Sequence, residues 1–249
     1  MKSVPMTLLG LTLLAGLLAS APSRADPSSC EVPAYLLLTE SPLPRVEAAV
    51  KAGRLLDIVV VGSRSSSIAT SEASAWPSRL QAMLTERLKV PVNVSVELQI
   101  KKTAEEVATG LVKLVEVKKP TLVIWQTGTY DAMRSVDPED FRTAVGDGVV
   151  GLKEAGADVI LMNLQYSPRT EAMISAPPYL DNMRVVAQQF DVPLFDRFAI
   201  MRHWNDQGDF DLFSAAHGLD LAKRVHNCIG RALGKFVVDA ARIEPAQQN

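Results

Sequence analysis

A serine-rich turn, Gly62-Ser63-Arg64-Ser65-Ser66-Ser67, and two late residues, His217 and Asp220, have the residue types of nucleophilic hydrolysis. In that chemistry a serine hydroxyl attacks a carbonyl carbon while a histidine, oriented by an aspartate, accepts the serine proton. Ser63 or Ser65 is the candidate nucleophile, and His217 and Asp220 are the candidate base and its partner. The alternative is structural, because serines in such turns cap the following helix or hydrogen-bond the loop.

Five apolar runs predict the strands that would position these residues. They occupy residues 56–61, 92–98, 121–126, 158–163 and 192–196, and helices are predicted at 76–88, 103–117, 137–155, 178–190 and 220–241. This alternation is typical of an α/β fold, a three-layer α/β/α sandwich with a mostly parallel five-stranded sheet. Only residues 92–98 alternate apolar and polar side chains, which favours a position near the sheet edge.

Four segments are expected at one edge of this sheet, because loops leaving parallel strands at their carboxyl ends emerge together. They are GSRSSS after the first strand, QIKKT after the second, TGTYDA after the third and DLFSAAHGLD before the last helix. Helix-start signals at Thr103-Ala-Glu-Glu106 and Asp137-Pro138 support the boundaries of two helices between them.

These segments and their order, with LVIWQTGT, VILMNLQYSPR, FDRFAIMRHW and HNCIGRAL, resemble the Ser-Gly-Asn-His (SGNH) or GDSL-like hydrolases over essentially the whole mature chain. The resemblance implies a flavodoxin-like sheet and hydrolysis of esters of lipids, sugars or small acids. It also implies a first-loop serine nucleophile, a late histidine base, and an oxyanion site made of two backbone amides and an asparagine.

The same resemblance places a different residue type at every catalytic position. The nucleophile falls on Arg64, the oxyanion glycine on Lys101 and the asparagine on Tyr130. The late D-G-L-H becomes H-G-L-D, so that His217 replaces the aspartate and Asp220 replaces the histidine. A guanidinium has no free lone pair, and an unperturbed aspartate is a weak base at neutral pH. The sequence therefore predicts a divergent member that has lost ester hydrolysis.

Arg64 leads to two further expectations. It would face Asp220 where a serine once faced an imidazole, and a bidentate ion pair would close the cleft. With Lys101 it would form an anion-binding site for a carboxylate, sulfate or phosphate. The alternative is that Asp131 and Asp220 neutralise the two cations internally.

The first 25 residues resemble a secretory signal peptide, with a positive Lys2, the apolar run MTLLGLTLLAGLLA and a small-x-small cleavage site ending at Ala25. That run is shorter than the roughly 20 residues of a membrane span. We expect a mature single domain, residues 26–249, that is secreted or periplasmic and has no membrane span; an uncleaved anchor is the alternative.

The two cysteines, Cys30 and Cys228, predict one disulfide in an oxidising compartment, the alternative being two separate buried thiols. His203, His217 and His226 have no metal-ligand spacing, so no metal or other cofactor is expected.

A formal net charge of −2 and the lack of long basic runs do not favour nucleic acid as a partner. Two functions remain open. The first is a pseudoenzyme with a binding or accessory role in the cell envelope and a small anionic or ester-containing ligand. The second is an active carboxylester or carbohydrate-ester hydrolase with a rearranged Ser63 or Ser65, His217 and Asp220 centre.

Overall fold

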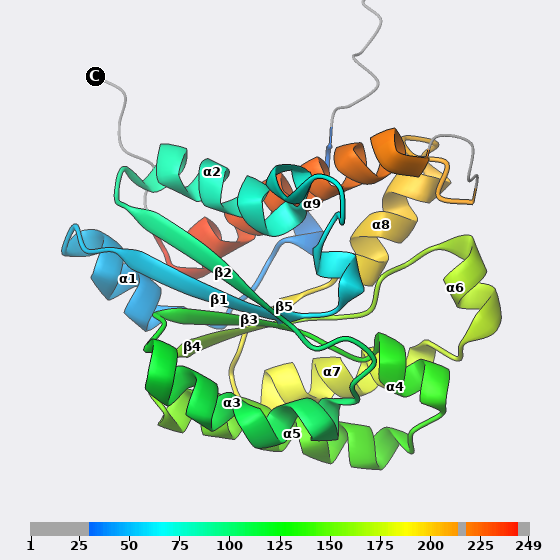
Figure 1. Ribbon diagram of the computed structural model, residues 1–249, viewed down its shortest axis with the longest axis horizontal. Coiled ribbons are helices and arrows are strands. Elements are labelled where there is room, and N and C mark those ends of the chain that lie inside the picture. The colour runs from blue at the N-terminus through cyan, green and yellow to red at the C-terminus, as the bar shows by residue number, and fades with distance from the viewer. Residues whose placement is uncertain (1–29, 214–217, 244–249) are drawn as a thin grey trace, which may run out of the picture.

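The computed structural model of the protein describes residues 30–213 and 218–243. One five-stranded sheet runs through it in the order β2-β1-β3-β4-β5, and each neighbouring pair is parallel. Helices cover both faces of this sheet (Figure 1), so the expected three-layer α/β/α fold is confirmed. The strands are β1 (Leu56–Gly62), β2 (Val92–Leu98), β3 (Leu122–Gln126), β4 (Asp158–Met162) and β5 (Leu194–Phe195).

Helices α2 and α9 pack together on one face, and α5 packs between α3 and α7 on the other (Figure 1). The helices are α1 (Pro44–Lys51), α2 (Trp76–Leu88), α3 (Ala104–Lys118), α4 (Thr129–Arg134), α5 (Pro138–Glu154), α6 (Pro168–Met173), α7 (Pro177–Gln189), α8 (Arg197–Asp206) and α9 (Gly218–Ala240), with short 3-10 turns η1 (Ala34–Leu36), η2 (Arg64–Ser66) and η3 (Glu72–Ser74).

The strands follow the expected burial. Every residue of β3 and β4 is buried, as a continuous apolar run between two helical layers requires. The alternating strand β2 lies at one edge, as predicted. The other edge strand, β5, has two residues instead of the predicted five, and Pro193 immediately before it has no backbone hydrogen to donate.

Sequence signals for helix starts are confirmed at two places. Thr103 and Glu106 form a reciprocal capping box at α3, and the Asp137 carboxylate accepts a hydrogen bond from Glu139 N at α5. Helices α1, α4, α6 and α8 were not predicted. The start of α1 is capped by a residue far away in the sequence. The buried Asp158 carboxylate accepts hydrogen bonds from the amides of Arg45 and Val46 at 2.8 and 3.0 Å.

The predicted disulfide between Cys30 and Cys228 is present and joins the start of the described chain to α9 across a separation of 198 residues. Trp204 reinforces this attachment, because its indole Nε1–H donates to the Glu31 carbonyl at 2.8 Å. The predicted signal peptide and its cleavage site before Asp26 lie outside the described residues. Within those residues, no helix is both long and apolar enough to cross a membrane.

Candidate functional site

The loops after β1 and β3 meet where the strand order of the sheet reverses direction. In a parallel sheet with the order 2-1-3-4-5, connections from these two strands leave toward opposite faces, and a crevice opens between them at the carboxyl ends. Ser63 directly follows β1, and Gln126 is the last residue of β3. The candidate site is therefore built on these two strand ends.

Three serine hydroxyls converge on the side chain of Gln126, which is 6% exposed. Its amide nitrogen donates to Ser63 Oγ at 3.0 Å and to Ser65 Oγ at 2.8 Å, while its Oε1 accepts from Ser66 Oγ at 2.6 Å. Gly62 permits this turn, because a Cβ at that position would collide with the Ser66 side chain. The serine turn is thus fixed to β3 by one amide.

A second donor reaches Ser65 from the other side. Arg197, the first residue of α8, donates from Nη1 to Ser65 Oγ at 3.1 Å, and the two hydroxyls of Ser63 and Ser65 lie 3.1 Å apart. A serine hydroxyl has two lone pairs and one hydrogen. Ser65 uses its lone pairs on Gln126 and Arg197, so its hydrogen goes to Ser63. Ser63 then accepts twice, and its own hydrogen has no acceptor among the described residues.

Arg197 is a buried cation, 1% exposed, and forms no ion pair within the described residues. Burial lowers the pKa of its guanidinium to about 10, so it remains charged at neutral pH. Its Nε–H has no hydrogen-bond partner in the described chain. Neither Arg197 nor Gln126 was predicted from the sequence; the available signal was a polar side chain at the end of the buried strand β3 for Gln126, and one just after β5 for Arg197.

His226 of α9 is a structural acceptor. Its Nδ1 accepts from the backbone N–H of Trp76, the first residue of α2, at 3.0 Å. Burial, assisted by the charge of Arg197, lowers the pKa of His226 to about 4. The imidazole is therefore neutral at pH 7 and carries its hydrogen on Nε2.

Arg64 lies between Ser63 and Ser65 but is exposed, and its guanidinium makes no hydrogen bond or ion pair with the described residues. Asp220, in the first turn of α9, is exposed as well. The expected Arg64–Asp220 ion pair is therefore wrong. Two solvated charges gain little from pairing, because water already stabilises each of them.

A small cavity of about 30 Å³ lies at the two strand ends and contains three of the predicted positions, Ser63, Lys101 and Tyr130, together with Gln126 and Asp131. Arg64 and Asp220 do not line it. Lys101 has a φ of 58°, the left-handed conformation that favours glycine. Lys101 thus has a backbone conformation that a glycine adopts more readily than a lysine.

Asp131 forms no ion pair with Lys101 or Arg64, so the alternative that it neutralises these two cations is wrong. Its side chain is 1% exposed, and Oδ1 accepts from the Ala104 N–H at the start of α3 at 2.7 Å. Burial raises its pKa, and the backbone hydrogen bonds oppose that rise in part. Asp131 thus connects the start of α3 to the first turn of α4, which carries Tyr130.

His217 lies outside the described residues, so its relation to the serines is not defined. Within the described residues, no cluster of three or more histidine, cysteine, aspartate or glutamate side chains has a geometry suited to a metal ion.

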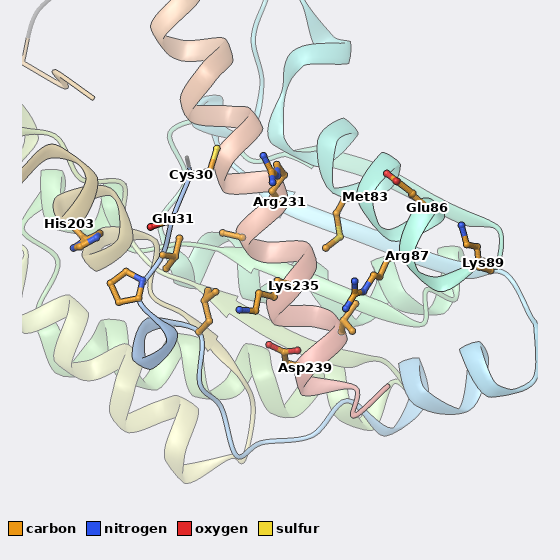
Figure 2. Close-up of a pocket in the computed structure, with 15 residues that line it drawn as sticks. Cys30, Glu31, Met83, Glu86, Arg87, Lys89, His203, Arg231, Lys235 and Asp239 are labelled. Carbon is orange, nitrogen blue, oxygen red and sulfur yellow. The ribbon is translucent and has the colours of Figure 1, made fainter. Parts of the chain in front are cut away.

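A larger cavity, about 910 Å³, involves Cys30 but none of the predicted catalytic or anion-binding residues. Figure 2 shows its side chains around α9, with Met83 and Arg87 of α2 on one side and Glu31 and His203 on the other. Its wall mixes acidic and basic groups, so it does not present a field of one sign.

The doubly wound sheet and the site at its switch point define the fold class of SGNH and GDSL-like esterases. The chain belongs to the Non-GDSL lipase-like family, whose family model matches residues 29–243. The resemblance seen in the sequence is thereby confirmed at the level of family and fold. No curated protein matches the chain by sequence.

Several solved structures have the same fold. TesA is similar with a TM-score of 0.56 and 20% identity, covering 72% of this chain and 99% of TesA. The psychrotrophic esterase EstA from Pseudoalteromonas sp. has a TM-score of 0.58 and 17% identity, covering 74% and 97% of the respective chains. The acetylxylan esterase Axe2 from Geobacillus stearothermophilus has a TM-score of 0.57 and 15% identity, covering 73% and 93%.

Proposed function

We propose that this protein is an exported member of its family that does not hydrolyse esters by the serine route and acts as a binding or accessory protein in the cell envelope. The observation that carries the proposal is the hydrogen bonding of Ser63 and Ser65. Their side-chain hydroxyls bond to each other and to the Gln126 amide, Ser65 also accepts from Arg197, and none of these described partners can act as a base toward them. A serine nucleophile needs an adjacent group that accepts its proton.

Arg64 supports the same proposal. It occupies the position that the resemblance gives to the nucleophile, and a guanidinium cannot attack a carbonyl carbon. Lys101 and Tyr130, in the places of the oxyanion glycine and asparagine, line the cavity in which an oxyanion would be held. A lysine side chain at a glycine position occupies space through which a substrate must approach the backbone.

The rival proposal is an active carboxylester or carbohydrate-ester hydrolase. One observation favours it: Ser63 faces the cavity with a hydroxyl hydrogen that has no acceptor in the described chain. His217 would have to accept that proton, with Asp220 as its partner.

An assay of the mature protein with p-nitrophenyl acetate and butyrate, combined with intact-mass analysis after a fluorophosphonate probe, separates the two proposals. We expect no turnover above buffer and no adduct. Turnover that Ser63→Ala or Ser65→Ala abolishes would refute the pseudoenzyme proposal. Ser67→Ala is the matched control, because Ser67 belongs to the same turn and bonds only to the Arg64 carbonyl among the described residues.

Export is part of the proposal and rests on the predicted signal peptide and the disulfide. Disulfides persist in oxidising compartments. N-terminal sequencing of protein recovered from a bacterial periplasm should begin at Asp26; a chain that retains Met1 in the cell membrane would contradict cleavage.

A further inference from the structure

The cavity at the ends of β1 and β3 has a size that restricts what it can hold. Its volume is about 30 Å³, and one water molecule needs roughly 10–15 Å³ of such space. There is room for about two water-sized groups, which corresponds to the two oxygens of a carboxylate.

The cavity wall supplies hydrogen-bond donors for such a group. The hydroxyl hydrogen of Ser63 is unassigned, because both of its lone pairs already accept from Gln126 and Ser65. Tyr130 also lines the cavity; its oxygen accepts from Arg134 Nη1 at 3.4 Å, which leaves the phenol hydrogen for another acceptor. Lys101 adds an ammonium group that forms no ion pair with the described residues.

The balance of charge around the cavity favours an anion. Two exposed cations, Lys101 and Lys102, line it with one carboxylate, Asp131, whose Oδ1 accepts from Ala104 N and whose Oδ2 has no hydrogen-bond partner among the described residues. Behind the serine turn lies Arg197, fully buried and without a carboxylate partner in the described chain. Its charge acts through Ser65 on the Ser63 hydroxyl and strengthens that group as a donor.

Lys101 occupies its position against a backbone preference. A non-glycine residue in the left-handed region is less stable than glycine there, and such conformations concentrate at ligand sites. Glycine would relieve the strain but remove the ammonium group. The strain is consistent with a role for the side chain itself.

We propose that Ser63, Lys101 and Tyr130 form a binding site for the carboxylate group of a ligand. The inference rests on the proposed function, since it assigns a ligand class to a site that does not cleave esters. A carboxylate is narrower than the set of anions expected from the sequence. The cation that contributes is Lys101, because Arg64 is exposed and does not line the cavity.

The test uses the ¹⁵N-labelled mature protein titrated with sodium acetate at constant ionic strength, against sodium chloride and inorganic phosphate. We expect saturable shifts of the Gln126 side-chain amide and the Gly128 backbone amide with acetate, and weaker binding of phosphate. Lys101→Gly should weaken acetate binding at least tenfold and raise the melting temperature.

Lys119→Gly is the matched control. Lys119 also has a left-handed backbone, with φ of 50°, and ends α3 outside the cavity. It should raise the melting temperature without changing acetate binding. Absence of saturable shifts, equal affinity for phosphate, or unchanged acetate affinity in Lys101→Gly would overturn the inference. Ester turnover, measured separately, would overturn the proposed function instead, so the two failures can be told apart.

Discussion

Lowering the pH should destabilise the protein through His226. Its pKa falls from 6.5 to about 4 on folding, because burial disfavours the charged imidazolium and the nearby charge of Arg197 disfavours it further. The unfolded chain therefore binds a proton in a pH range where the folded chain does not. Stability from this group is complete above about pH 6.5 and is lost as the pH falls to about 4.

The magnitude follows from the difference in pKa. Each unit of difference between the unfolded and folded pKa corresponds to about 1.4 kcal/mol of stability. The difference between 6.5 and about 4 therefore gives about 3 kcal/mol as an upper value. Urea denaturation at intervals between about pH 7.5 and 4 measures this loss of stability. His226→Gln is the control, because a glutamine amide oxygen can still accept from Trp76 N and does not titrate. Burial raises the pKa values of Asp131 and Asp158, which changes stability with the opposite sign, so the difference between wild type and variant isolates the histidine.

Two results would refute this reasoning. One is an equal pH dependence in wild type and His226→Gln. The other is a long-range ¹H–¹⁵N spectrum in which Nδ1 carries the hydrogen. Arg197→Met should raise the pKa of His226 while leaving it below its ordinary value, because burial is the larger cause of the shift.

Two further changes test the packing around α9. Breaking the disulfide with Cys30→Ser should lower the free energy of unfolding by about 5 kcal/mol at most, which is the chain-entropy value for a loop of 198 residues. A reducing agent should destabilise the wild type by the same amount and should leave the Cys30→Ser variant unchanged. A change below about 1 kcal/mol would show that the bond adds little constraint. Gly230→Ala should destabilise by about 1–3 kcal/mol, because its Cβ would lie 2.9 Å from the Trp76 carbonyl oxygen of α2. Gly110→Ala, with nothing within 4 Å, should stabilise α3 by up to about 1 kcal/mol, and similar unfolding curves for the two variants would contradict the close contact.

The sheet could be predicted because its signals are local. Continuous apolar runs identify strands buried between two layers, and the alternation in residues 92–98 identifies the edge strand. Helix α8 was missed because it begins at Arg197, two residues after the end of β5, and continues with Phe198-Ala199-Ile200-Met201, an apolar run that has no helical period of its own. Helix α4 has six residues, too few for a pattern to develop.

The site could be predicted in part. Ser63, Lys101 and Tyr130 converge because loops from neighbouring parallel strands must emerge together. The direction of each side chain within its loop depends on tertiary contacts, which the sequence pattern does not contain. The predicted Arg64–Asp220 ion pair was wrong for this reason. Ser63 and Ser65 bond to Gln126, while Arg64 between them is exposed and forms no ion pair with Asp220.

The two edge strands of the sheet differ in length, and this difference affects self-association. Strand β5 offers only two residues to an incoming strand, whereas β2 offers seven. Unpaired backbone groups on a long border can template pairing with another molecule, and charged side chains there discourage it. Glu97 is the charged residue of β2, where it pairs with Lys118 of α3. Aggregation of a partly unfolded chain should therefore start along β2, and the side chain at position 97 should control how readily it begins.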